Sequence, residues 1–245
     1  MKQTKIIMGM PITVELVGKQ DRSALSPVFN YFKEVDERFS PYKPTSELAK
    51  VNDGLAKTLW SEPMHEVMKL CEQTKQLSGG FFDIKRADGT LDPSGLVKGW
   101  AIDNAAKLLK SAGYSDFYIE AGGDIQTAGL NEHHEAWAVG IRSPFELNQI
   151  VKTIKLNGQA IATSGTYIRG EHIYDPVNNF AAPAQLVSLS VIGPNIFEAD
   201  RFATAAYAMG ERGINFIASL PGFEAYQINQ AGQATFTKGF NRYVA

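Results

Sequence analysis

The sequence predicts a mixed fold of the α/β or α+β class, because helical and strand-like segments follow one another irregularly along the chain. Apolar residues recur at helical spacing in several stretches, and short runs rich in β-branched residues lie between them. No repeat, linker or low-complexity segment divides the 245 residues. A chain of this length suits one domain. We therefore expect residues 1–245 to form a single domain without a doubly wound strand order.

The N-terminal half combines three expected helices with two expected strands. The helical segments carry apolar residues every three to four positions, at residues 26–39, 62–77 and 98–112. Gly79-Gly80 follows the second helix and Gly113 the third, as glycines do beyond a helix C-terminus. Near alternation of β-branched residues predicts one strand at residues 6–17. A shorter strand at residues 117–120 precedes the turn Gly122-Gly123-Asp124.

The C-terminal half is richer in strands. Strand-like segments occupy residues 136–142, 151–156, 160–163 and 186–192, and we expect the last to be buried on both faces. A helix is expected from Asn195 to Met209, because Asn195 and Glu198 match a capping box and Gly210 follows. A short helix at residues 214–220 precedes a hairpin. The two strands of that hairpin are expected at residues 223–228 and 234–237.

Composition limits the classes of function. The formal net charge of −2 gives no basic field for nucleic acid, and no stretch approaches the roughly 20 apolar residues that span a bilayer. Cys71 is the only cysteine, so no internal disulfide forms, and its apolar surroundings predict a buried side chain. The first residues lack the pattern of a secretory signal. We expect a cytoplasmic protein, with an exported or lipid-anchored protein whose signal was removed as the alternative.

Two groups of residues could bind a metal or a phosphate. Asp200 and Thr204 lie four positions apart on an expected helix, so both oxygens face one side. Such hard oxygen donors suit Mg²⁺ better than zinc, although a solvated surface pair is the alternative. Asp92-Pro93-Ser94-Gly95 forms a turn that opens a helix, and backbone amides there could hold phosphate beside Lys98. An ordinary cap with a surface lysine is the alternative.

Two further groups could act on a substrate. Ala162-Thr163-Ser164-Gly165 is a hydroxyl-rich strand end that His172 follows. His172 could act as a general base, since histidine titrates near neutral pH, or it could be structural. Tyr42 follows a helix in the turn Ser40-Pro41-Tyr42. Its ring could stack on a planar ligand or pack in the ordinary way.

Taken together and in order, these motifs resemble the FAD:protein FMN transferase family, also called the ApbE-like family. The resembling segments cover nearly the whole chain: Met8-Gly9-Met10, 39–47, 79–84, 92–101, Gly122-Gly123-Asp124, 162–165, His172-Ile173-Tyr174-Asp175-Pro176 and 198–204. One departure is Arg201, which stands where the family has a small residue. The resemblance implies a single compact two-lobed flavin-transferase fold with mixed sheets and flanking helices.

The resemblance also implies roles for individual residues. Asp200 and Thr204 would bind Mg²⁺ through side-chain oxygens, and Gly95 would bind it through its backbone carbonyl. His172 would take the proton from the acceptor hydroxyl, and Lys98 would help to neutralise the pyrophosphate. The positions that would line the FAD site are Met8, Tyr42, Phe81, Phe82, Asp83, Asp92, Lys98 and Tyr174.

The implied reaction transfers FMN from FAD, the substrate, to a Thr or Ser hydroxyl of an acceptor flavoprotein and releases AMP. The implied partners are FAD and that acceptor, with a membrane involved only through the acceptor or a removed anchor. Two alternatives stay open. Only eight residues separate Asp83 from Asp92 where the family has a longer insert, which suggests an open site and an Mg²⁺-dependent FAD pyrophosphatase. The other alternative is an FAD-binding protein without catalysis.

Overall fold

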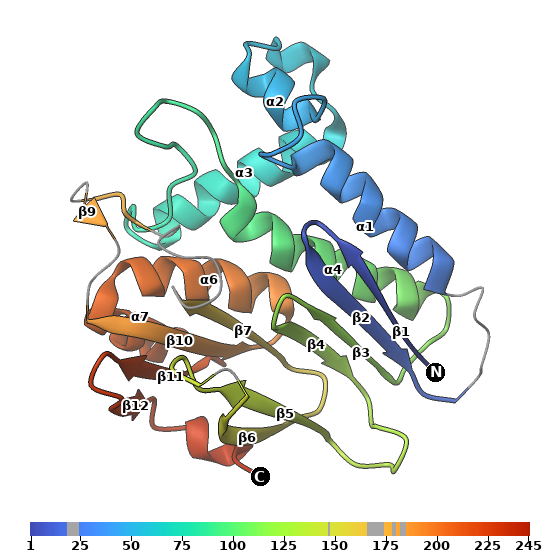
Figure 1. Cartoon of the computed structure of the whole chain (residues 1–245), viewed down its shortest axis with the longest axis vertical. Helices are drawn as coiled ribbons and strands as arrows, with labels where there is room; N and C mark the ends of the chain where they lie inside the picture. Colours follow the sequence, from blue (N-terminus) through green and yellow to red (C-terminus); the bar gives the residue numbers. More distant parts are fainter. Residues whose placement is uncertain (19–24, 147, 166–173, 178–179, 182–184) are drawn as a thin grey trace.

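The computed structural model describes residues 1–18, 25–146, 148–165, 174–177, 180–181 and 185–245. Its centre is an eight-stranded sheet in which all neighbouring strands are antiparallel (Figure 1). In spatial order the strands are β1 (Lys2–Ile7), β2 (Met10–Leu16), β3 (Phe117–Ala121), β4 (Asp124–Ala128), β7 (Ala160–Gly165), β10 (Leu186–Gly193), β11 (Glu224–Asn229) and β12 (Ala234–Phe236). The antiparallel order makes the fold α+β rather than doubly wound.

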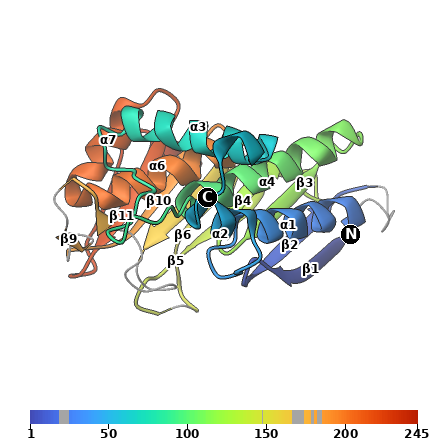
Figure 2. The same cartoon turned by 90° about the horizontal axis from the view of Figure 1, so that it is seen from above.

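Helices cover one side of this sheet, as the view from above shows (Figure 2). They are α1 (Leu25–Phe39), α2 (Glu47–Asn52), α3 (Glu62–Leu77), α4 (Ser94–Ser111), α6 (Ile196–Ala208) and α7 (Gly213–Ser219). Short 3₁₀ turns occupy Lys57–Leu59, Gly210–Arg212 and Phe240–Tyr243. No helix among the described residues combines the length and apolar character needed to cross a bilayer.

Two apolar cores lie on opposite faces of the sheet. The larger one joins the inner faces of α1, α3, α4 and α6 to one face of the sheet. The smaller one lies between the other face and the hairpin of β5 (Trp137–Arg142) and β6 (Ile150–Leu156). Because the two cores lie on opposite faces, strand β10 is covered on both sides, as expected from the sequence, and Cys71 is buried in the larger core. A separate two-stranded pair is formed by β8 (Tyr174–Asp175) and β9 (Phe180–Ala181).

Most elements agree with the sequence expectations, but several differ. Residues 6–17 form two strands instead of one, because Met8 and Gly9 adopt positive φ angles of 56° and 70° and turn the chain back. Helix α4 begins at Ser94, four residues before the expected start. Helix α2 and strand β4 were not expected at all. The early start of α4 matters most, because it places Gly95 and Lys98 on one rigid helical turn.

Helices α4 and α6 approach each other closely because α4 carries glycines at the crossing (Figure 1). A Cβ atom at Gly99 would lie 2.6 Å from Cβ of Asp200 and 2.8 Å from the carbonyl oxygen of Ile196. A Cβ at Gly95 would lie 3.0 Å from Cγ2 of Thr204. Gly95 and Gly99 are one helical turn apart, as are Asp200 and Thr204. The two pairs therefore face each other across the helix crossing.

Candidate active site

The crossing of α4 and α6 brings together the residues that the sequence selected as metal ligands. The Thr204 hydroxyl donates to the carbonyl oxygen of Gly95 at 3.1 Å. The backbone N–H of Gly99 donates to Oδ2 of Asp200 at 2.7 Å. Asp200 is 3% exposed, so the alternative of a solvated surface pair is wrong for this residue.

Lys98 lies at the same crossing and joins two carboxylates. Its Nζ atom is 2.6 Å from Oδ2 of Asp124 and 3.6 Å from Oδ1 of Asp200. Asp124 is fully buried at the start of β4, and its Oδ1 accepts from the backbone N–H of Thr163 at 3.1 Å. The Lys98 side chain is only 16% exposed, so it is not the surface lysine of the alternative interpretation. One ammonium thus faces two buried carboxylates.

This arrangement places negative charge where water cannot reach it. Burial is the largest cause that raises the pKa of Asp200 well above its usual range, and the neighbouring Asp124 carboxylate raises it further. The Lys98 ammonium and the Gly99 N–H oppose both effects. Ionised Asp200 is therefore costly in this site, and an additional cation would favour the ionised form.

The donor atoms at the crossing fit a hard divalent cation. Asp200, Thr204 and the Gly95 carbonyl all present oxygen, the ligand atom that Mg²⁺ prefers. Oδ2 of Asp124 is buried and forms an ion pair with Lys98. The described part of the chain contains no group of three or more His, Cys, Asp or Glu side chains that could hold a metal. A cation here would therefore depend partly on neutral oxygens.

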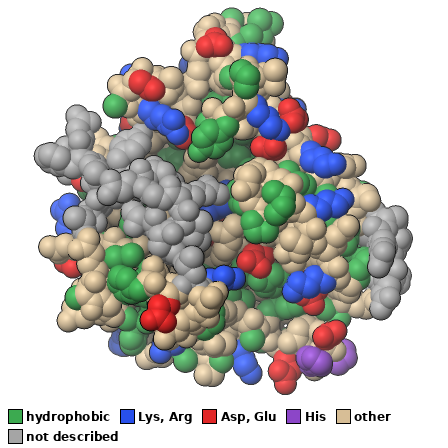
Figure 3. Space-filling view, in the orientation of Figure 1, with side chains coloured by type: hydrophobic (Ala, Val, Ile, Leu, Met, Phe, Trp, Pro, Cys, Tyr) green, Lys and Arg blue, Asp and Glu red, His purple; other side chains and the backbone are tan. Residues whose placement is uncertain are grey.

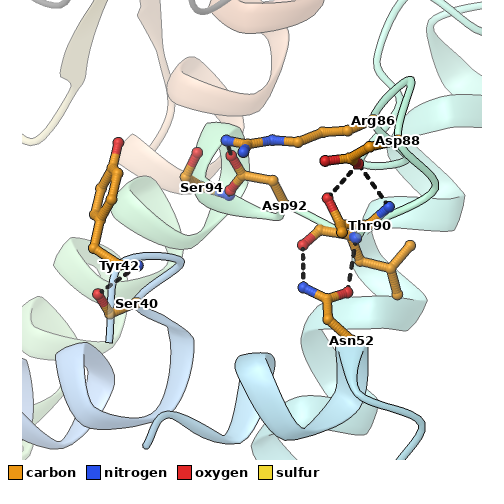
Figure 4. A network of polar contacts seen from close by, with 9 residues as sticks. Ser40, Tyr42, Asn52, Arg86, Asp88, Thr90, Asp92 and Ser94 are labelled. Carbon is orange, nitrogen blue, oxygen red and sulfur yellow. Dashed lines mark hydrogen bonds and ion pairs between the residues drawn. The ribbon is translucent and has the colours of Figure 1, made fainter. Parts of the chain in front are cut away.

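A short arm, residues 84–92, runs up to the start of α4 (Figure 4). Asn52, at the end of α2, accepts from the Leu91 N–H at 2.8 Å and donates to the Leu91 carbonyl at 3.1 Å. Asp92 forms an ion pair with Arg86, and its Oδ1 accepts from the Ser94 N–H at 3.0 Å. Asp92 thereby gives a partner to the backbone N–H of the first residue of α4, whose N-cap, Pro93, makes no side-chain cap.

Aromatic side chains lie around this helix start. Tyr42 is 89% exposed and stands across an open space from Asp92 and Ser94 (Figure 4). Phe82 is buried below the crossing, where a Cβ at Gly95 would meet its ring at 3.4 Å. The surface is hollowed between the part that carries α2 and the strands, with Lys and Arg side chains at the edge (Figure 3). An exposed tyrosine of this kind could stack on a planar ring.

Met8, Phe81 and Asp83, three further expected site residues, lie outside the cluster at the crossing. Met8 forms the turn between β1 and β2, and Phe81 lies near Arg212, whose Cζ is 5.9 Å from the ring centroid. Asp83 binds Lys75 at 2.7 Å and accepts from the Lys85 N–H at 2.9 Å. His172 lies outside the described residues, as does the side chain of Tyr174, whose backbone belongs to β8.

Asp124 was not selected as a site residue from the sequence, although it lies in one of the motifs that carry the resemblance. No local signal marked this residue, because β4, the strand that it opens, was not predicted. Only the structure shows that this strand is buried at all five positions, where a carboxylate requires a partner. What the sequence did not show is that the partner is Lys98, because the contact depends on how β4 packs against α4.

Comparison with known proteins places these observations in a family. The family model described as the ApbE family matches residues 8–88 and 84–227. The FAD:protein FMN transferase of Escherichia coli K12 is 29% identical over 153 residues, which cover 59% of this chain and 44% of that protein. The protein of the same name from Vibrio cholerae is 33% identical over 130 residues, which cover 49% of this chain and 39% of that protein. The matched regions thus span less than half the length of these relatives.

Solved structures share the fold. The flavin transferase ApbE from Vibrio cholerae superposes with a TM-score of 0.87 at 22% identity, covering 99% of this chain and 98% of that one. The ApbE protein from Thermotoga maritima gives a TM-score of 0.87 at 19% identity, covering 100% and 99%. The fold extends over both chains, and the family model matches most of the sequence. The chain therefore belongs to the ApbE family.

Proposed function

We propose that the protein transfers FMN from FAD to a Thr or Ser hydroxyl of an acceptor protein, in an Mg²⁺-dependent reaction that releases AMP. One observation carries the proposal: the buried, oxygen-lined cluster of Asp200, Thr204, Gly95 and Lys98 lies at the first turn of α4. Hard oxygen ligands, a lysine and a helix N-terminus together suit phosphoryl transfer. The names of the sequence relatives support the same activity.

The roles follow the chemistry of each group. Asp200, Thr204 and the Gly95 carbonyl would hold Mg²⁺, which would supply positive charge at the pyrophosphate. Lys98 and the first amides of α4 would face the same phosphates, and Tyr42 would stack on a ring of FAD. The acceptor oxygen forms a bond to the FMN phosphorus while the bond from that phosphorus to the bridging oxygen breaks. The bridging oxygen leaves with AMP, and His172 takes the acceptor proton.

The other FAD-lining roles remain part of the proposal. Met8, Phe81, Phe82, Asp83, Asp92 and Tyr174 would complete the walls of the FAD site. The exposure of Tyr42 favours hydrolysis of FAD as a second candidate activity, because an open site admits water as the attacking group. The two activities would use the same phosphate-binding residues and would differ in the attacking oxygen.

The test is incubation with FAD and Mg²⁺, with and without an acceptor. The acceptor is a Thr-containing subunit of a flavin-carrying electron-transfer protein. AMP release and the intact mass of the acceptor are then measured. AMP together with an FMN adduct on the acceptor supports the transferase. AMP with free FMN and no adduct supports the pyrophosphatase, and absence of AMP under all conditions contradicts both. The Asp200→Ala variant should release no AMP at any Mg²⁺ concentration.

The role of His172 makes a separate prediction. His172→Ala should slow transfer by roughly 10²–10⁴-fold, the usual contribution of a general base, while FAD binding stays nearly unchanged. Single-turnover transfer and flavin fluorescence titration measure the two quantities. His133→Ala is the matched control, since His133 is 76% exposed in the described structure. A collapse of FAD affinity in His172→Ala would assign the residue to binding instead.

A further inference from the structure

We propose that Asp124 is a positioning residue that holds the Lys98 ammonium and thereby leaves Asp200 available to a divalent cation. The inference rests on the proposed function, because it concerns the Mg²⁺ site named there. Asp124 is not itself required as a ligand. Its role is to keep the Lys98 ammonium paired with Asp124 instead of with Asp200.

The distances show which carboxylate Lys98 prefers. Nζ of Lys98 is 2.6 Å from Asp124 but 3.6 Å from Asp200. The shorter contact is that of a direct charge-assisted bond, whereas the longer one exceeds hydrogen-bond range. Lys98 is therefore held mainly by Asp124, and its Nζ stays beyond hydrogen-bond range of Asp200.

The two oxygens of Asp200 have different surroundings. Oδ2 accepts from the Gly99 N–H at 2.7 Å, which fixes the carboxylate against α4. Oδ1 is the oxygen that faces Lys98. An ammonium that moved about 1 Å closer would reach bonding distance of Oδ1, where it would compete with a cation for the same atom.

Asp124 cannot follow such a movement, because its position is fixed by the sheet. Its Oδ1 accepts from the Thr163 N–H at 3.1 Å, which ties it to β7. The turn before it uses Gly122 and Gly123 at φ angles of 59° and 94°, a conformation that other residues rarely adopt. Lys98 is the flexible partner, and Asp124 is the fixed one.

Charge balance gives the consequence of removing Asp124. When both carboxylates are ionised, as cation binding requires, Asp124, Asp200 and Lys98 together carry a net charge of −1. Asp124→Asn keeps the shape and an acceptor for the Thr163 N–H, but it removes the preferred partner of Lys98. The ammonium then pairs with Asp200, and the local charge becomes zero. A divalent cation would then find no net negative charge at the crossing, and Oδ1 of Asp200 would already be paired with Lys98.

The experiment measures Mn²⁺ binding to the full chain by the electron paramagnetic resonance signal of free Mn²⁺. Four proteins are compared: wild type, Asp124→Asn, Lys98→Met and the double variant. Asp124→Asn should bind Mn²⁺ about 10–100-fold more weakly, as loss of a partner outside the ligand set typically does. The double variant should recover affinity towards that of wild type, because the competing ammonium is gone. Lys98→Met alone should bind at least as tightly as wild type.

Several results would overturn the inference. A double variant as weak as Asp124→Asn would make Asp124 a ligand or a purely structural residue. An unchanged affinity in Asp124→Asn would show that Asp124 has no part in cation binding. Wild type that binds no Mn²⁺ would remove the metal site itself, and with it the Mg²⁺-dependent function. Thermal unfolding of each variant checks folding, and Lys98→Met tests the competition even if Asp124→Asn does not fold.

Discussion

At the scale of single residues, Arg201 shows how neighbouring positions on one helix serve different purposes. It stands inside the motif that carries Asp200 and Thr204, yet successive helix positions point about 100° apart. Its guanidinium binds Glu198 through two nitrogens at 2.6 and 3.0 Å and donates to the Thr74 hydroxyl of α3 at 3.3 Å. Arg201 therefore links α6 to α3 and points away from the proposed cation site.

This placement predicts a loss of stability without a loss of cation binding. Arg201→Ala should lower the free energy of unfolding by about 1–3 kcal/mol, because Glu198 and Thr74 lose a largely buried partner. Urea denaturation measures the stability, and Mn²⁺ titration of the folded variant measures the site. Arg142→Ala, at an exposed position on β5, is the matched control. Weakened Mn²⁺ binding with unchanged stability would place Arg201 in the site instead.

At the scale of elements, the sequence predicts long amphipathic helices well and short or turn-defined segments poorly. Helix α3 has the bounds expected from its apolar spacing, since burial of one face decides where such a helix lies. Helix α2 is only six residues long and depends on its Ser46 cap, so it shows no periodicity. The β1–β2 turn was missed because Met8 is itself apolar and continues the strand-like pattern of residues 6–17. Methionine also seldom adopts the positive φ angle that the turn requires.

The same reasoning explains how far the site could be predicted. The Asp200 and Thr204 pair was found because both lie on one helix, where spacing in sequence fixes direction in space. The Asp200 contact with Gly99 joins positions 101 residues apart, and the Thr163 contact with Asp124 joins positions 39 apart. No local pattern predicts such pairs. The turn at residues 92–95 marked Lys98 as a candidate phosphate-binding residue, and the resemblance to the family added Gly95 as a metal ligand. Only the packing of α4 on α6 and β4 shows how they meet.

The arm at residues 84–92 gives a prediction at this scale. Asn52→Ala should speed amide hydrogen exchange at Leu91, because both backbone bonds to the arm are lost. FAD affinity should fall several-fold as the arm and Asp92 lose their fixed position. Global stability should change by less than about 0.5 kcal/mol, since the lost contacts are exposed.

The measurements are hydrogen exchange by mass spectrometry, FAD titration and urea denaturation. Asn30→Ala, on the exposed side of α1, is the matched control and should change none of the three. Unaltered exchange at Leu91 together with normal FAD binding would show that the arm holds its place without Asn52.

At the scale of the whole molecule, the site joins elements from both halves of the chain. Lys98 and Gly95 come from α4, whereas Asp200 and Thr204 come from α6, and Asp124 opens a central strand of the sheet. Both helices also belong to the larger core. A ligand bound at the crossing therefore contacts elements that must all be folded together, and the unfolded chain offers it no equivalent site.

The unfolding temperature should therefore rise with Mg²⁺, and rise further with Mg²⁺ and FAD together. A ligand present at 100 times its dissociation constant adds about 2.7 kcal/mol to the free energy of unfolding. For a chain of this size that corresponds to a shift of roughly 5–10 °C in one transition. Differential scanning calorimetry at several Mg²⁺ concentrations measures the shift. For Asp200→Ala, the unfolding temperature with Mg²⁺ should equal the unfolding temperature of the same variant without Mg²⁺. An equal shift in Asp200→Ala would locate the stabilising Mg²⁺ away from the α4–α6 crossing, and two separate transitions would mean that the halves unfold independently despite the shared site.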